Sequence, residues 1–198
     1  MKMKITVVTG LALALLVPTV AGAKPTPNAG DKRAAKSECN MFRGHSHATR
    51  EAFQAKFTTF KACVKQKAAE EAQEAQNAHT NAAKECKAAR TENPTQFMED
   101  WGTPGQNGAN RNGKNAFGKC VSSTAKAKEN KADAKDEQDA TEFKNAAKEC
   151  ANERSEDAEG FKTTYGTEGS NRKNAFGKCV SQKVREDNEQ PETTQPTS

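Results

Sequence analysis

The stretch Asn-Ala-Phe-Gly-Lys-Cys-Val at residues 115–121 decides the fold, because the same seven residues return in the same order at 174–180. Upstream of these stretches lies a second matched block, Asn-Ala-Ala-Lys-Glu-Cys, which occurs at 81–86 and again at 145–150. Identity over two separate blocks does not arise by chance in one chain. The two segments are therefore copies of one unit that carries two cysteines.

An aromatic pair lies between the two cysteines of each copy. The pair is Phe97 and Trp101 in the second copy and Phe161 and Tyr165 in the third, and Gly-Thr follows both pairs. Residues four apart share one side of a helical turn, so each pair can pack against the neighbouring cysteines as a small core. We favour this structural interpretation over a carbohydrate or ligand platform built on Trp101 and Tyr165.

A more diverged copy precedes these two. Residues 35–39 stand for the first block, Phe53 and Phe57 for the aromatic pair, and residues 60–64 for the second block. This copy lacks the loops that the later copies insert at 102–114 and 166–173. The loop is therefore dispensable to the unit.

The motif Asn-Ala-Phe-Gly-Lys-Cys-Val-Ser, at 115–122 and 174–181, resembles one in a family of uncharacterised secreted bacterial proteins. The resemblance covers the second and third copies well, and the first only through Phe60, Cys63 and Val64. It implies no activity, and it supports the division of the chain into repeat units.

The first residues predict an exported product, because Lys2 and Lys4 precede an apolar run at 5–17 and a small-residue cleavage site. The mature chain is expected to start at Lys24. The apolar run is too short to span a bilayer, and no later stretch is apolar enough to do so. The sequence thus predicts a secreted protein, located outside the cell or in the cell-wall space.

The copies and the leader divide the chain into segments. We expect a signal peptide at 1–23, disordered residues at 24–31, three repeats at 32–66, 79–124 and 143–184, and a disordered tail at 185–198.

Little apolar bulk remains beyond the signal segment, which holds every Leu and Ile of the chain. The core must be built mainly from Phe and Ala, and Ala buries little area to offset backbone entropy. Six cysteines in an exported chain indicate a disulfide framework. The net charge of +5 becomes about +3 without Lys2 and Lys4. Acids and bases alternate throughout, which is typical of a solvated surface and not of a nucleic-acid partner.

Helices are predicted between the copies, because residues 65–81 and 122–142 consist almost wholly of Ala, charged and amide residues, without Pro or Gly. We expect two long helices, Thr49 to Arg90 and Asn115 to Asn152, in an all-α fold of disulfide-stapled helical repeats with roughly four helices. No alternating β-branched run predicts a strand.

The expected helices restrict the disulfide pairing. Cys63 and Cys86 lie on one helix, about 34 Å apart at 1.5 Å per residue, which is far beyond disulfide reach. The same argument excludes Cys120 with Cys150. The equivalence of the copies then favours Cys39–Cys63, Cys86–Cys120 and Cys150–Cys179.

Antiparallel pairing through Cys86–Cys120 would place Phe143 beside Cys63. Small residues at a 4,3 spacing would then form a narrow seam between the long helices, and these residues are Ala68, Ala72, Ala75, His79, Ala82, Cys86 and Ala89. Lys128 and Asp136 interrupt the facing helix. A rod of separate cross-linked units is therefore the alternative to an antiparallel helical bundle.

Basic residues recur beside the aromatic pairs, so Trp101, Tyr165, Lys119 and Lys178 form a possible binding surface. Their basic neighbours in the two copies are Arg111, Lys114, Arg172 and Lys173. Repeated positive charge beside an aromatic side chain suits an acidic polymer or an anionic wall component. Ordinary solubilising surface charge is the plainer interpretation.

His45 and His47 are candidate metal ligands, although no second ligand pair at a recognised spacing supports them. The chain has no Cys-x-x-Cys motif and no serine-nucleophile elbow, so neither an enzyme nor a cofactor is expected. The leading hypothesis is a secreted, non-enzymatic structural or interaction module, a helical rod that acts on an unidentified protein or envelope polymer. The alternative is an extracellular protein that binds a metal or a glycan.

Overall fold

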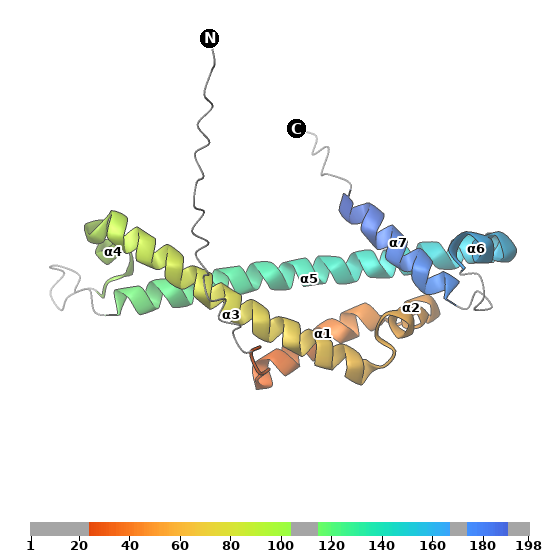
Figure 1. Cartoon of the computed structure of the whole chain (residues 1–198), viewed down its shortest axis with the longest axis horizontal. Helices are drawn as coiled ribbons and strands as arrows, with labels where there is room; N and C mark the ends of the chain where they lie inside the picture. The colour runs from red at the N-terminus through yellow and green to blue at the C-terminus, as the bar shows by residue number, and fades with distance from the viewer. Residues whose placement is uncertain (1–23, 104–114, 167–173, 190–198) are drawn as a thin grey trace, which may run out of the picture.

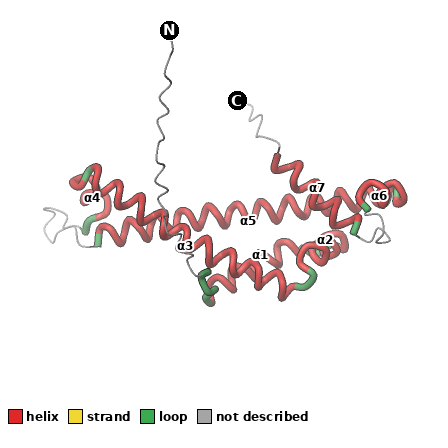
Figure 2. Tube along the Cα trace, in the orientation of Figure 1, coloured by secondary structure: helices red, strands yellow, loops and turns green. Residues whose placement is uncertain are grey.

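The computed structural model describes residues 24–103, 115–166 and 174–189; the expected signal peptide at 1–23 lies outside these residues. The described residues form seven helices and no strand (Figures 1 and 2), which confirms the all-α prediction. The helices are α1 (Ala29–Arg43), α2 (His47–Phe57), α3 (Phe60–Glu92), α4 (Pro94–Trp101), α5 (Ala116–Glu156), α6 (Ala158–Tyr165) and α7 (Ala175–Glu189).

The two long helices α3 and α5 lie alongside one another and give the molecule an elongated shape (Figure 1). At one end α4 covers the junction between α3 and α5, and at the other end α2, α6 and α7 gather around the second half of α5. The sequence led us to expect roughly four helices. The described residues contain more because short turns divide each expected hairpin.

The expected helix from Thr49 to Arg90 is wrong at one point, because the chain breaks between α2 and α3. Thr58 adopts a φ of +63°, which ends α2, and the Thr59 hydroxyl accepts a hydrogen bond from the Ala62 backbone N–H at 3.1 Å. Threonine is a favoured N-cap residue, so this bond starts a new helix. The expected helix from Asn115 to Asn152 matches α5 closely.

Part of each end that was expected to be disordered is helical. The Asn28 side chain caps α1, and the Asp31 carboxylate accepts a hydrogen bond from the Asn28 backbone N–H at 2.6 Å, so that residues 29–31 are helical. This reciprocal capping box satisfies N–H groups that the first turn leaves without partners. At the other end α7 continues to Glu189, so residues 185–189 are helical as well.

Three disulfides join the helices in the pairs that the spacing predicts. Cys39 on α1 pairs with Cys63 on α3, Cys86 on α3 with Cys120 on α5, and Cys150 on α5 with Cys179 on α7, at Cα separations of 6.1, 6.0 and 6.0 Å. Because α3 and α5 each carry two of these cysteines, the cross-links tie α1, α3, α5 and α7 into one covalent series.

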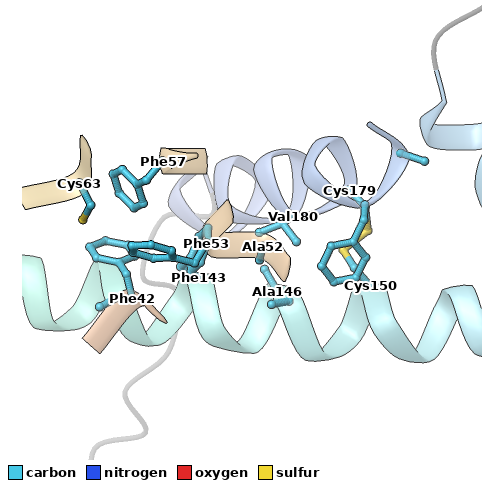
Figure 3. Close-up of a cluster of buried hydrophobic side chains, with 14 of the residues drawn as sticks. Phe42, Ala52, Phe53, Phe57, Cys63, Phe143, Ala146, Cys150, Cys179 and Val180 are labelled. Atoms are coloured by element: carbon cyan, nitrogen blue, oxygen red, sulfur yellow. A yellow bond between two sulfur atoms is a disulfide. The ribbon is translucent and has the colours of Figure 1, made fainter. Parts of the chain in front are cut away.

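The main core lies where α1, α2, α5 and α7 meet, and Figure 3 shows many of its side chains. Phe143 of α5 makes an edge contact with Phe42 of α1 at 5.3 Å between ring centroids, and it belongs to the same cluster as Cys63, as predicted. The cysteines of the first and third copies all belong to this cluster, so these two copies share one core.

The buried stripe on α3 agrees in part with the predicted seam, and it includes Cys86 as predicted. Ala68, Ala72, Ala78 and Ala82 are buried on α3, whereas Ala75 is half-buried and both His79 and Ala89 are exposed. The helix α3 packs against α1 as well as against α5, so its buried residues are not confined to one stripe that faces α5. His79 is therefore not the packing residue that the heptad pattern suggests.

Candidate functional site

Each aromatic pair packs on the disulfide of its own copy. Phe97 is buried and Trp101 is half-buried in a small cluster with Cys86 and Cys120. In the third copy the ring centroids of Phe161 and Tyr165 are 4.9 Å apart, and both residues belong to the main core together with Cys150 and Cys179. These positions support the structural interpretation of the pairs. Tyr165 also lines a surface cleft.

A surface cleft of about 640 Å³ lies between α2, the end of α6 and α7, over Phe143 of α5. Tyr165 and Lys178, two residues of the predicted binding surface, line it. Trp101 and Lys119 lie on α4 and α5 at the opposite end of the molecule (Figure 1), where Lys119 Nζ is 3.1 Å from Thr103 Oγ1. The four predicted residues therefore do not form one surface.

Within the lining of the cleft, α7 approaches α2 closely at one glycine. A Cβ built on Gly177 would lie 2.8 Å from the Cβ of Ala55, so any larger residue would push the two helices apart. Gly118 holds the same place in the identical stretch of the second copy, and a Cβ there would meet nothing within 4 Å. The motif glycine thus makes a close interhelical contact in only one of the two copies.

Positive charge dominates the side chains that line the cleft. Lys56, Lys178 and Arg185 contribute three cations, and Glu51 is the single acid among the lining residues. The Arg154 guanidinium already pairs with Glu51 through two hydrogen bonds of 2.6 and 2.9 Å. The cleft is therefore electrostatically suited to an anionic group.

Lys56 occupies an unusual position for a cation. Its Nζ lies 5.1, 5.5 and 5.3 Å from the ring centroids of Phe42, Phe57 and Phe143. Burial of the ammonium group against these rings lowers the pKa of Lys56, and the nearby charge of Lys67 lowers it further. Attraction to the faces of the rings offsets part of the lost hydration.

An ion network fixes the Tyr165 side of the cleft. The Tyr165 hydroxyl donates to Glu153 Oε2 at 3.0 Å, and Lys183 Nζ lies 2.7 Å from Glu153 Oε1 and 3.3 Å from Glu149 Oε2. Burial raises the pKa of Tyr165, and its hydrogen bond to the Glu153 carboxylate adds to that rise. This network holds α5, α6 and α7 in register beside the Cys150–Cys179 bond.

The motif phenylalanine stacks against an arginine that the sequence patterns considered above do not predict. The Arg90 guanidinium lies 5.0 Å from the ring centroid of Phe117, and Arg154 lies 4.4 Å from that of Phe176. Both arginines come four residues after the first cysteine of their copy. That shared spacing is the signal that could have predicted the contact.

A buried ionic cluster lies where α1 and α3 meet α5. Glu38 is only 3% exposed, and its Oε1 forms an ion pair with Lys67, whose Nζ is also 2.9 Å from Glu70 Oε2 and 3.6 Å from Asp136 Oδ1. Glu38 Oε2 has no hydrogen-bond partner. Burial outweighs the attraction to Lys67 and raises the pKa of Glu38 to about 7.

Glu71, on the next turn of α3, extends the same cluster. Its pKa is also raised to about 7, mainly by burial and secondarily by the negative charge of Asp133. Glu38, Glu71 and Asp136 each have a carboxylate oxygen within 4.8 Å of the others. Lys67 supplies the compensating charge in this cluster, so we interpret it as a structural ion network.

The histidines considered as metal ligands lie apart from these acids. Both His45 and His47 are exposed, and His47 Nδ1 is 3.8 Å from Glu51 Oε2. Within the described ranges, the Glu38 group is the only set of three candidate ligands, and it includes neither histidine. The basic residues Arg111, Lys114, Arg172 and Lys173, together with most of the two inserted loops, lie outside the described residues.

Comparison of the chain with protein-family models, with curated proteins and with solved structures finds no match.

Proposed function

We propose that this chain is an exported, non-enzymatic interaction module, a helical spacer that presents a basic cleft at one end. The cleft carries the proposal, because three cations and a half-buried tyrosine converge there on a surface with one already paired acid. The helix α5 extends for 41 residues, or about 60 Å, between this end and the Cys86–Cys120 end. Such a length suits a spacer.

Export is supported by the cysteines and by the leader sequence. Disulfides persist in oxidising compartments outside the cytosol, and all six cysteines of this chain are paired. Among the described helices, none is both long and apolar enough to cross a membrane. Secretion into the extracellular or cell-wall space, and the resemblance to secreted bacterial proteins, belong to this proposal.

An acidic polysaccharide of the cell envelope is the partner that the cleft favours. Lys178 and Arg185 are exposed on α7, where they can pair with successive anionic groups, while Tyr165 offers a ring face to a sugar. Because an acidic polysaccharide is both an envelope polymer and a glycan, this partner agrees with the leading hypothesis and with the glycan-binding alternative. The metal-binding alternative has less support, because the two candidate histidines are not joined by other ligands.

Co-sedimentation at neutral pH with carboxymethyl dextran gel, an insoluble polysaccharide whose carboxylates are ionised, tests this proposal, with neutral dextran gel as the reference. The double variant Lys178→Ala/Arg185→Ala should weaken retention roughly fivefold to tenfold, because two exposed charge pairs are lost. Lys119→Ala/Lys126→Ala is the control with the same loss of charge, since Lys119 occupies the same motif position at the distant end and Lys126 is exposed on the same helix.

Equal loss of retention in the control and in the double variant would mean that charge alone drives binding, and would contradict a role for the cleft. Equal retention on dextran would exclude an acidic partner. A divalent-metal titration of the wild type and of His45→Ala checks the alternative: a metal affinity that this substitution abolishes would reverse the ranking of the two hypotheses.

A further inference from the structure

A second depression, of about 440 Å³, lies between α1 and α3 in the first copy and shares no residue with the basic cleft. Phe60, Val64 and Ala68 form its apolar surface along α3, and Pro27 adjoins them. Because these α3 residues are spaced by four, they share one helix face and extend over about 12 Å. We call this depression the lysine groove, because lysines are its only other lining residues.

The apolar surface of the lysine groove is held in place from behind. Phe60 and Val64 are half-buried and pack against the main core, and the Phe60 ring stacks with Phe53 at 6.3 Å between centroids. Ala68 is buried. The surface is therefore a preformed part of the fold, so a ligand would meet a rigid apolar wall.

Four lysines complete the lining, two from each helix. Lys32 and Lys36 lie four apart on α1, and Lys61 and Lys65 lie four apart on α3. All four are exposed, and within the described residues no ion pair involves them. The lining includes no acidic residue. Like charges at this spacing repel one another, and an anion would relieve that repulsion.

The apolar wall and the four lysines together indicate which kind of ligand the lysine groove can bind. Lysine stems can cover an apolar chain while their ammonium groups stay in water, so the lining suits an apolar tail with an anionic head. No other polar side chain lines the groove, which leaves a peptide backbone without hydrogen-bond acceptors. A flat membrane surface would contact projecting apolar residues, whereas Phe60 and Val64 are half-buried in a depression beside exposed lysines.

We propose that the lysine groove binds a free long-chain fatty acid, with the acyl chain along Phe60, Val64 and Ala68 and the carboxylate among the four ammonium groups. This site goes beyond the proposed function, and its test does not depend on the basic cleft.

Isothermal titration of the purified, oxidised protein with laurate, below its micellar concentration, tests the site. One laurate should bind per chain, and octanoate should bind at least about tenfold more weakly, because four fewer methylene groups are buried. Dodecyltrimethylammonium has the same chain with a positive head and should show no saturable binding.

Two variants with the same loss of charge locate the site. Replacing Lys32, Lys36, Lys61 and Lys65 by Gln should weaken laurate binding about tenfold or more. Replacing Lys84, Lys87, Lys126 and Lys131 by Gln is the control, because these exposed lysines lie outside the groove and should leave the affinity unchanged. Circular dichroism checks that both variants keep the wild-type fold.

Three outcomes would overturn the proposal. They are no saturable binding of laurate, an equal loss of affinity in the two lysine variants, and equal binding of the cationic surfactant. Binding to phosphatidylglycerol vesicles without binding to free laurate would assign the groove to a membrane surface and would also reject a fatty-acid site.

Discussion

Two glycines at the same position of an identical motif have different surroundings. Gly177 lies against Ala55 of α2, whereas a Cβ at Gly118 would meet no atom within 4 Å. Sequence comparison alone assigns both glycines the same role, because it does not show which copy packs against another helix. The tertiary contact between α2 and α7 creates the difference, and both Gly177 and Ala55 line the basic cleft.

We predict opposite effects for alanine at the two glycines. Gly177→Ala should lower the free energy of unfolding by about 1–3 kcal/mol, because the new methyl group overpacks the contact with Ala55. Gly118→Ala should be neutral or stabilising by up to about 1 kcal/mol, since Ala favours helix over Gly. Urea unfolding of both variants measures the difference. Equal effects would show that α7 does not pack on α2 as described.

The buried carboxyl group of Glu38 predicts a pH dependence of stability. Its pKa is about 7 in the folded chain against an ordinary value of 4.5, so the folded state binds more protons between these two pH values. Stability is therefore expected to fall as the pH rises through this range, by no more than about 3 kcal/mol from Glu38. Glu71 acts in the same direction.

Thermal melting at pH 5 and pH 8 measures this dependence. Glu38→Gln should reduce the difference in melting temperature between the two pH values, because the amide cannot titrate. Glu137→Gln, at an exposed position of α5, is the control and should keep the wild-type difference. A wild-type protein that is more stable at pH 8 than at pH 5 would contradict the described burial of Glu38.

At the scale of helices, the sequence was sufficient for the long elements and insufficient for their interruptions. Ala-rich and charge-rich segments predict α3 and α5 because helix propensity accumulates over many residues. The break at Thr58 and Thr59 depends on one positive φ and one capping hydroxyl, which a strong helical pattern on both sides obscures. The cysteine pairs were predictable because the helices separate the wrong partners.

The packing of α3 against α5 through small alanine side chains can be tested by substitution. Ala82 is fully buried between α3 and α5, so Ala82→Leu should force the helices apart and lower the free energy of unfolding by about 1–3 kcal/mol. Ala69→Leu, at an exposed position of the same helix, should change it by less than about 0.5 kcal/mol. Chemical denaturation compares the two variants. Equal stability would indicate that α3 and α5 do not pack through Ala82.

For the whole molecule, the position of the candidate site was only partly predictable. The repeats made Trp101 with Lys119, and Tyr165 with Lys178, look equivalent. The fold places them at opposite ends of α5, and only the second pair lies beside α2. Lys56 and Arg185 come from outside the matched motif blocks, so no repeat signal could have added them to the site.

Stability is distributed unevenly over this elongated chain. The larger aromatic core is at the end where the first and third copies meet, while the Cys86–Cys120 end has a small cluster around Phe97 and the middle has mainly alanines. On the loop-entropy estimate, each disulfide contributes about 3–4 kcal/mol. Together the three disulfides contribute an amount of the same size as the net stability of a typical folded domain, which is about 5–15 kcal/mol.

Thermal melting followed by circular dichroism at 222 nm, with and without a strong reductant, tests most directly whether the disulfides maintain this fold. We predict a cooperative transition for the oxidised chain. After reduction, most of the helical signal and the cooperativity should be lost at the same temperature. An unchanged melting temperature and helical signal in the fully reduced chain would contradict the account.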